Sequence, residues 1–205
     1  MKLETGSMGR QELHELIGIG LSPLPIAFIS TVSPDGIYNA APFSFAAPIC
    51  SKPPVICVSI GLMLGKRKDT IRNIESAHDF VVNTVDEEIL KQVIQTSAGY
   101  PYETDEITAT GLTAIPSERV KSPRIGEAKI SLECRLLQKL QLMEDYKDGP
   151  GLRDVVFGEI VTIHIKDEVL TDGKVDPLKL NLISRIGGDL YCKPGEIFEL
   201  KPDKV

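Results

Sequence analysis

The amino-acid sequence predicts a mainly β protein with some α-helix, built as an antiparallel β-barrel with a few peripheral helices. Three observations lead to this prediction. Six or more segments have the composition of strands, few segments have that of helices, and the early connections are as short as those of hairpins. Short connections favour an antiparallel barrel over a doubly wound sheet, in which helices alternate with parallel strands.

The first two strands are expected to form a hairpin. Residues 26–32 (IAFISTV) are mostly β-branched or aromatic, and they lead into the sequence SPDG at residues 33–36. This tetrapeptide places Pro at the second position and Gly at the fourth position of a type I turn. The return strand, residues 37–45 (IYNAAPFSF), is unusual, because an amide, two methyl side chains, a proline and a hydroxyl stand where a buried strand prefers Val and Ile.

Two helices are expected to interrupt the strands. Residues 69–77 and 86–94 have apolar side chains at helical spacing, and Asp69 is expected to cap the first of these helices. Residues 97–126 are predicted to form a long polar loop, and a short helix is expected within residues 176–199. The remaining strands are predicted at residues 54–60, 80–85, 129–143 and 154–169, the last with one buried and one partly exposed face.

The length and composition predict one domain. The chain has 205 residues, of which 42% are hydrophobic and 25% are charged, which is enough for one core. Residues 1–8 (MKLETGSM) are predicted to be an expression leader or a disordered start, and residues 9–205 a single domain. The net charge of −6 disfavours a general nucleic-acid binder, although a local basic cluster can still bind a small anion.

The sequence also predicts a soluble cytoplasmic protein that binds neither nucleic acid nor membrane. No apolar run approaches the roughly 18 residues of a membrane span, and the N-terminus lacks the layout of a signal peptide. The cysteines are expected to be buried thiols of a reducing compartment, because they form no C-x-x-C pair and three of them stand in or beside apolar runs. They are Cys50, Cys57, Cys134 and Cys192.

Common catalytic and metal motifs are absent. Pro23 stands where a dinucleotide-binding fingerprint that begins at Gly18 requires its third glycine. No G-x-S-x-G motif is present, and the three histidines lie far apart without the spacing of metal ligands. We therefore predict no catalytic residue and no metal site. The histidines, His14, His78 and His164, are expected on the surface or on a sheet face.

One basic cluster has the character of a phosphate pocket. Residues 66–70 (KRKDT) combine three cations and a hydroxyl immediately before the helix at 69–77, whose free amides favour an anion. We expect Lys68 and Thr70 to face the anion while Asp69 faces the helix amides. The alternative is a solvated basic loop in which Asp69 only caps the helix.

The small residues of the return strand suggest a ledge for a flat heterocycle. Ala40, Ala41, Ala46 and Ala47 would let a ring approach the backbone closely. Pro42 cannot donate a hydrogen bond to a neighbouring strand, so the strand is expected to be irregular there. Two alternatives remain: a plain edge bulge at Pro42, and tight core packing for Ala40 and Ala41.

At this point several segments together resemble a known family. PIAFISTVSPDGIYNAAPFSF, SKPPVICVSIG, KRKDTIRNI and FVVNTV are similar to the flavin reductase-like proteins with an FMN-binding split barrel, which include the flavoredoxins. Later segments agree, namely GLTAIPSERVKSPRIGEAKISLECRLL, FGEIVTIHI and RIGGDLYCKPGEIFEL. The resemblance runs from about residue 20 to residue 200, and the motifs stand in family order.

The resemblance implies a homodimer with one FMN per subunit near the dimer interface. It implies that the ring lies on residues 39–47 and that Ser44, Lys68 and Thr70 hold the phosphate. It also implies that the tail motif, from which Arg185 is taken, contributes to the site or to the interface. The full set of predicted cofactor-binding residues is Asn39, Ala41, Pro42, Phe43, Ser44, Phe45, Ala46, Gly61, Lys66, Lys68, Asp69, Thr70 and Arg185.

The function implied is that of an FMN-dependent oxidoreductase. Electrons would come from NADH or NADPH and pass by way of FMN to free flavin or to a protein acceptor. In flavin enzymes the cofactor supplies the chemistry and the protein supplies placement and polarity, which agrees with the lack of a catalytic constellation. The alternative is a non-catalytic FMN-binding module for storage or sensing. A heme or pyridoxal-phosphate relative is disfavoured, because no His lies within the candidate pocket segments.

Overall fold

The computed structural model describes residues 1–63, 65–146 and 149–202, together with all their side chains except those of residues 143–152. The predicted domain of residues 9–205 therefore includes residues 64, 147–148 and 203–205, which lie outside the described part. The strands are β1 (Ala27–Val32), β2 (Tyr38–Phe43), β3 (Ala46–Ser51), β4 (Pro54–Met63), β5 (Lys66–Arg67), β6 (Asp79–Asn83), β7 (Ala114–Ile115), β8 (Arg124–Ile125), β9 (Ile130–Tyr146), β10 (Gly149–Ile165), β11 (Leu170–Thr171), β12 (Lys174–Val175), β13 (Ser184–Gly187) and β14 (Leu190–Cys192). The helices are α1 (Arg10–Gly20), α2 (Asp69–Ala77), α3 (Leu90–Gln95), α4 (Glu106–Ala109) and α5 (Pro177–Leu180), with 3₁₀ turns η1 (Thr5–Ser7) and η2 (Asp167–Val169).

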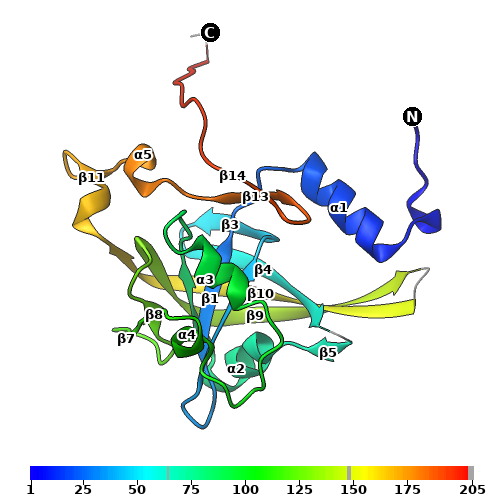
Figure 1. Cartoon of the computed structure of the whole chain (residues 1–205), viewed down its shortest axis with the longest axis horizontal. Coiled ribbons are helices and arrows are strands. Elements are labelled where there is room, and N and C mark those ends of the chain that lie inside the picture. Colours follow the sequence, from blue (N-terminus) through cyan, green and yellow to red (C-terminus); the bar gives the residue numbers. More distant parts are fainter. Residues whose placement is uncertain (64, 147–148, 203–205) are drawn as a thin grey trace.

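One antiparallel sheet forms the body of the molecule (Figure 1). Its strands follow the order β2-β1-β6-β9-β10-β4-β3, and β5 pairs with β4. The two end strands, β2 and β3, are consecutive in the chain and are joined by Ser44 and Phe45. The amide of Ser59 on β4 donates to the carbonyl of Phe45 at 2.8 Å. The sheet therefore curls into a barrel whose seam is the Ser44–Phe45 corner, and the predicted antiparallel barrel is confirmed.

The β1–β2 hairpin explains the unusual return strand. The amide of Gly36 donates to the carbonyl of Ser33 at 3.0 Å, as expected for the predicted turn. The pairing of β1 with β2 is regular and includes Phe28 opposite Pro42, so the prediction of an irregularity or bulge at Pro42 is wrong. β2 is an end strand of the sheet, where a proline leaves no ladder donor missing. Strand β2 ends at Phe43 because the chain leaves β1 there and then pairs with β4 as β3.

The apolar residues form two clusters on the two faces of β1. Ile29 belongs to the cluster inside the barrel, whereas Phe28 belongs to the cluster under α3 and α4. Ala41 lies in the inner cluster and Ala40 in the outer one, so core packing is confirmed for both alanines. A Cβ atom on Gly158 of β10 would lie 2.4 Å from the Phe80 ring, so only glycine leaves room for that ring.

Between residues 69 and 126 the helices differ from prediction in three respects. α2 covers the predicted residues, but Lys68 occupies its N-cap without a side-chain bond, and the Asp69 carboxylate instead pairs with Arg72 at 3.0 Å. The prediction that Asp69 caps α2 is therefore wrong. α3 begins only at Leu90, because Asp86 accepts hydrogen bonds from the following backbone and forms a turn before it. The predicted polar loop contains α4.

Helix α1, which the sequence analysis missed, packs on the C-terminal hairpin β13–β14 (Figure 1). A Cβ atom on Gly18 would lie 3.5 Å from the carbonyl oxygen of Ile186, so the helix and the hairpin are in close contact. Leu24 and Arg185 exchange backbone hydrogen bonds at 2.8 and 2.9 Å. Met8, the last residue of the predicted leader, is buried. Both ends of the chain thus contribute to one surface beside the barrel seam.

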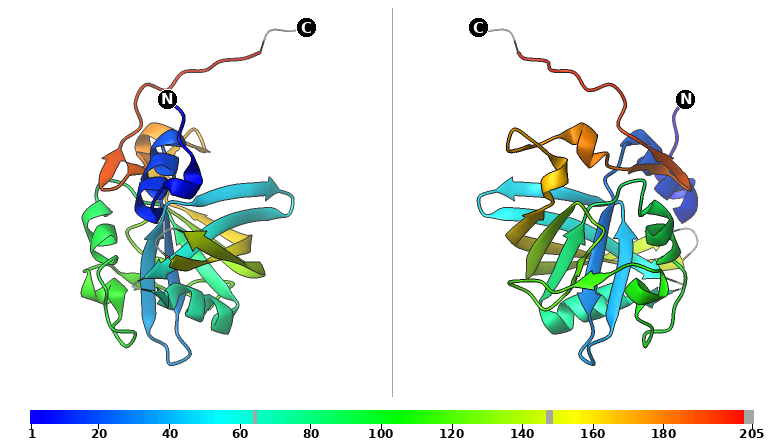
Figure 2. Two further views of the ribbon diagram at one scale, coloured as in Figure 1. Left: turned by 90° about the vertical axis from the view of Figure 1, so that its right-hand side faces the viewer. Right: turned by 60° about the vertical axis from the view of Figure 1, so that its left-hand side comes forward.

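β3 and the start of β4 project from the barrel as a two-stranded ribbon (Figure 2). Cys50 lies on this ribbon and is exposed, so the prediction of a buried thiol is wrong for this residue. Cys134 is buried, Cys57 and Cys192 are half-buried, and all four are free thiols. Within the described residues, no helix is both long enough and apolar enough to cross a membrane.

Candidate functional site

Three adjoining cavities surround the barrel seam and the start of α2. The helix cavity, of about 250 Å³, lies between the seam and α3 and is lined by Leu90, Val93 and Ile94. The arginine cavity, of about 240 Å³, is lined by Arg153 and Arg185. The loop cavity, of about 290 Å³, lies under residues 96–100. Lys68 lines all three, and every predicted cofactor-binding residue except Ala46 lines at least one.

Lys68 joins the basic cluster to the ledge. Its ammonium nitrogen lies 5.0 Å from the centre of the Phe43 ring. Burial lowers the pKa of Lys68, and the negative charge of Glu106 opposes that change. A cation held in a partly desolvated position interacts more strongly with an anion than a cation in open water does. The structure therefore brings together the two features that the sequence analysis had located separately.

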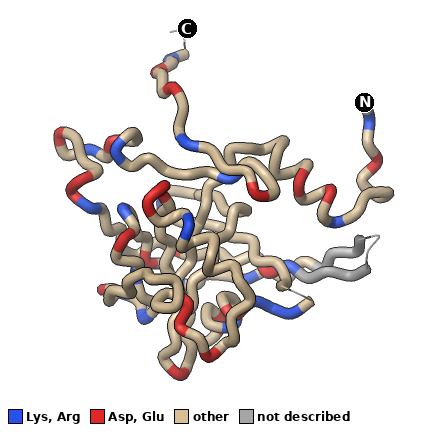
Figure 3. The backbone as a smooth tube through the Cα atoms, viewed as in Figure 1, with Lys and Arg blue, Asp and Glu red and all other residues tan. Residues whose placement is uncertain are grey.

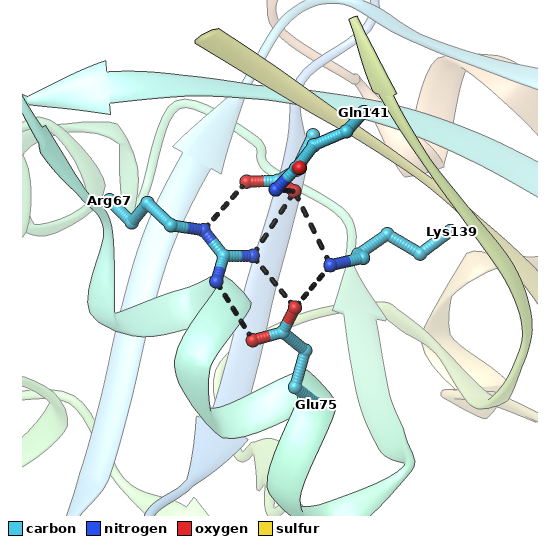
Figure 4. A network of polar contacts seen from close by, with 5 residues as sticks. Arg67, Glu75, Lys139 and Gln141 are labelled. Atoms are coloured by element: carbon cyan, nitrogen blue, oxygen red, sulfur yellow. Dashed lines mark hydrogen bonds and ion pairs between the residues drawn. The ribbon is translucent and has the colours of Figure 1, made fainter.

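Arg67 does not join Lys68 in this site. Its guanidinium donates to Glu75 at 2.7 Å and to Asp154 at 3.0 Å (Figure 4). Lys139 of β9 pairs with the same two carboxylates, and Gln141 donates to Asp154 at 3.2 Å. This ion network ties β5 to α2, β9 and β10. The predicted cluster is therefore divided: Arg67 holds the start of α2 on the barrel, and Lys68 reaches the cavities.

Thr70 and Asn39 bind each other in the wall of the loop cavity. The Thr70 hydroxyl donates to Asn39 Oδ1 at 3.0 Å, and Asn39 Nδ2 donates to Glu106 Oε2 at 2.6 Å. The same Glu106 oxygen accepts the Ala40 amide at 3.0 Å. Thr70 is only 1% exposed. Cofactor contacts by Asn39 and Thr70 stay a prediction, and the observed bonds give both side chains a structural role.

Glu106 is the acidic group of the site. It comes from α4, inside the stretch predicted as a loop, and it is 7% exposed. Burial is the main cause that raises the pKa of Glu106 to about 7; the charge of Asp69 adds to the rise, while the Ala40 amide and Lys68 act in the opposite direction. A carboxyl group with this pKa is able to hold or release a proton near neutral pH.

The other predicted residues take varied positions. Ser44 lines the helix and arginine cavities at the seam. Arg185 donates from Nε and Nη2 to the Gly188 carbonyl at 2.8 and 2.6 Å, which fixes its guanidinium at the cavity edge. Lys66 is exposed at the rim of the loop cavity. Ala46 lines a separate apolar cavity of about 190 Å³.

The sequence analysis missed His14, Glu106 and Arg153. The His14 ring on α1 lies 4.8 Å from the Phe45 ring with a tilt of 32°. His14 lies outside the candidate pocket segments of the sequence, but in the folded chain it lines the arginine cavity. Burial lowers the pKa of His14, and the charges of Arg153 and Arg185 lower it further. The local sequence gave no signal for these residues, because they come from segments that meet only in the folded chain.

The loop after α3 is held on α2. The Tyr102 hydroxyl donates to Asn73 Oδ1 at 2.8 Å, and the Arg72 guanidinium lies 3.9 Å from the centre of the Tyr102 ring. Tyr100 lines the loop cavity. In the part of the chain that the structure describes, no group of three or more His, Cys, Asp or Glu side chains is arranged to hold a metal ion.

Comparison with known proteins places this geometry in a family. The family model for the flavin reductase like domain matches residues 19–180. An uncharacterized protein of Halalkalibacterium halodurans is 38% identical over 201 residues, which is 98% of this chain and 95% of that protein. The uncharacterized protein YwrF of Bacillus subtilis is 33% identical over 199 residues, 96% of each chain.

Solved structures agree with the family match. The structure of nitrilotriacetate monooxygenase component B from Bacillus cereus superposes with a TM-score of 0.90 at 32% identity, covering 98% of both chains. The 2-nitrobenzoate 2-nitroreductase NbaA of Pseudomonas fluorescens gives a TM-score of 0.84 at 27% identity, covering 99% of this chain and 96% of that one. The flavoredoxin of Desulfovibrio vulgaris, at 22% identity and a TM-score of 0.76 over 98% of this chain and 97% of that one, shares the fold. This chain therefore belongs to the flavin reductase-like family, and its barrel is the split barrel of that family.

Proposed function

We propose that this protein is an FMN-dependent oxidoreductase that takes electrons from NADH or NADPH and passes them by way of FMN to free flavin or to a protein acceptor. One observation is central: the Lys68 ammonium and the Pro42–Ser44 segment line the same cavities, although one comes from the start of α2 and the other from the barrel seam. A cation beside a seam strand is the arrangement that a phosphorylated flat cofactor needs. Membership of the flavin reductase-like family supports the proposal.

The residues present fit the phosphate of FMN. Lys68 supplies a positive charge, and α2 supplies the positive end of its helix dipole. The N-cap of α2 makes no side-chain hydrogen bond to the first turn, so no side chain competes there with a phosphate oxygen. The exposed Lys66 adds a second cation at the rim of the loop cavity.

The residues also fit a planar ring. Pro42 and Ser44 offer a narrow strand edge at the seam, and the facing wall of the helix cavity is formed by the apolar side chains of Leu90, Val93 and Ile94. Apolar walls exclude water from a bound ring and bury its surface. When bound, FMN supplies the hydride exchange with a nicotinamide. Glu106 in the adjoining cavity wall has a pKa raised to about 7 by burial, so it is able to hold or release a proton near neutral pH.

Two structural neighbours support oxidoreductase chemistry. One is a component of a monooxygenase and the other is a nitroreductase. A monooxygenase component works together with another component, which agrees with a flavin or protein acceptor for this chain. We also propose a cytoplasmic location, where free thiols persist and nicotinamide donors are present.

We further propose that two copies form a symmetric dimer. Leu137, Leu140 and Leu142 of β9 are 51%, 43% and 50% exposed. Leu140 lies opposite the half-buried Val155 of β10, so the apolar face continues onto the next strand. Burial of such a face in a two-fold interface is the commonest way to cover it. Leu140→Asp is expected to shift the mass measured by light scattering after size exclusion from dimer to monomer; a wild-type protein that is monomeric at every concentration would contradict the proposal.

The proposed function has a direct test. Purified protein is expected to be yellow, or to quench the fluorescence of added FMN, and the bound flavin is expected to lose its visible absorption under anaerobic titration with NADH or NADPH. A colourless protein that leaves FMN fluorescence unchanged would overturn the proposal. Stoichiometric FMN binding without oxidation of either donor would instead identify a storage or sensing module.

A further inference from the structure

We propose that the arginine cavity binds an anionic group, carboxylate or phosphate, of an aromatic substrate that exchanges electrons at this site. This inference rests on the proposed function, because it assigns the second reactant of the same site. It separates that reactant from the FMN phosphate, which we assign to Lys68 and the start of α2.

The charge of the cavity lining is one-sided. Arg153 comes from β10, Arg185 from β13 and Lys68 from the start of α2, and the lining also includes the hydroxyls of Ser44 and Ser59. Among the described residues that line this cavity there is no Asp or Glu. This is unusual in a chain with a net charge of −6. The loop cavity, by contrast, includes Asp69 and Glu106 beside its cations.

The guanidinium groups are held in position. A Cβ atom on Gly61 of β4 would lie 3.3 to 3.4 Å from the guanidinium atoms of Arg153, so the glycine lets this group lie against the strand. The Gly188 carbonyl fixes Arg185. A pre-positioned guanidinium loses little side-chain entropy when it binds an oxyanion.

The pKa of a neighbouring histidine is affected by the same positive charges. His14 shares this lining, and after burial the charges of Arg153 and Arg185 are what lower its pKa. Positive charges that oppose protonation of an imidazole attract an anion to the same place. The direction of this pKa shift thus agrees with the geometry of the lining.

An aromatic surface lies beside these charges. The Phe45 ring is 4.8 Å from His14, and the Arg153 guanidinium is 5.8 Å from the centre of the same ring. Rings and cations side by side suit a flat molecule that has an acidic group at one end. Because Ser44 and Lys68 line both this cavity and the helix cavity, a substrate held here would lie next to the bound flavin.

The experiment compares an anion with its neutral analogue on the full-length protein. Benzoate and benzamide are titrated by calorimetry, with and without saturating FMN. Wild type is expected to bind benzoate about tenfold or more tightly than benzamide, without releasing FMN. Arg153→Gln is expected to abolish this preference and to change the FMN dissociation constant less than twofold. The control Arg119→Gln, which removes an exposed arginine outside all three cavities, is expected to keep the preference.

A second variant and a comparison of two electron donors complete the test. His14→Asp places a negative charge in the cavity from the surface helix α1 and is expected to weaken benzoate binding at least as much, so the test does not depend on the folding of one variant. NADH and the phosphate-free donor N-benzyl-1,4-dihydronicotinamide are compared by their KM values. A rise of about tenfold for NADH alone in Arg153→Gln would identify the donor phosphate as the anion, whereas a change for benzoate alone would identify a carboxylate.

Three outcomes would overturn the inference. They are equal affinities of wild type for benzoate and benzamide together with an unchanged KM for NADH, the same effects in Arg119→Gln, and an FMN affinity that falls in parallel with benzoate binding. The last outcome would assign the cavity to the cofactor. Failure of the proposed function can be told apart from failure of this inference. The titration without flavin measures the preference for benzoate over benzamide even if the protein does not bind FMN.

Discussion

The ammonium nitrogen of Lys68 lies 5.0 Å from the centre of the Phe43 ring. This contact joins the start of α2 to the last residue of β2, just before the barrel seam. The adjacent residues Arg67 and Lys68 have different partners. Arg67 is held by the ion network shown in Figure 4, while Lys68 reaches the cavities. Figure 3, which has the view of Figure 1, shows the basic residues of β5 in blue close to α2.

Removing the Lys68 charge is expected to weaken flavin binding. Lys68→Met keeps the length of the side chain and its contact with Phe43 but loses the charge-assisted bond to a phosphate. We expect the FMN dissociation constant to rise about tenfold or more, as measured by fluorescence quenching. Lys91→Met, on the exposed face of α3, is the control, and an equal effect in both variants would contradict a specific role for Lys68.

Removing the Thr70 hydroxyl is expected to destabilise the protein. Thr70→Val leaves the buried Asn39 oxygen with only the longer 3.4 Å contact from Thr31. We expect the free energy of unfolding to fall by about 1 to 3 kcal/mol in urea titration without FMN. Thr70→Ser retains the donor and is expected to restore most of the loss. A valine variant with wild-type stability but weaker FMN binding would instead favour a direct phosphate contact.

Glu106 is expected to make stability fall as the pH rises. Its folded-state pKa of about 7 lies above the ordinary value of 4.5, so the folded protein keeps a proton that the unfolded chain releases. The Glu106 contribution to the free energy of unfolding therefore declines between about pH 4.5 and pH 7 and is constant above that range. The neighbouring charges are Lys68, Asp69 and Asp105.

The variant Glu106→Gln isolates this effect. The free energy of unfolding of wild type, relative to that of Glu106→Gln, is expected to be larger at pH 5 than at pH 8. The measurement is urea unfolding of the flavin-free protein. A difference in stability that is the same at both pH values would show that Glu106 does not titrate between them.

Glu75 is expected to show the opposite dependence. The hydrogen bond from Arg67 is the main cause that lowers the pKa of Glu75 to about 2, and Lys139 adds to it. The stabilisation is present above the unfolded pKa of about 4.5 and is lost as the pH falls toward 2. Because Glu75 is one-third exposed, we expect Glu75→Gln to cost only about 1 kcal/mol at pH 7.

The loss in Glu75→Gln is expected to shrink at pH 3, where the wild-type carboxylate begins to bind a proton. Glu12→Gln on the exposed face of α1 serves as the control, with no loss expected at either pH. A cost for Glu75→Gln that grows as the pH falls would contradict the ion network as its cause.

Local patterns were sufficient where a segment buries one regular face. The hairpin β1–β2 and helix α2 follow from a turn tetrapeptide and from apolar residues at helical spacing, and both are confirmed. Helix α1 was missed because Gly18 is its only buried residue, so no apolar stripe marks it. Helix α4 was missed because it has four residues and lies in a polar segment.

The sequence by itself determined the antiparallel barrel, the family, and the two halves of the site, because each depends on composition and order along the chain. Only the tertiary structure decided that Arg67 binds carboxylates while Lys68 reaches the cavities, that the ledge is a barrel seam, and that His14, Glu106 and Arg153 belong to the site. The physical reason is that side-chain direction and the meeting of distant segments are set by strand pairing and burial, which no short stretch of sequence contains.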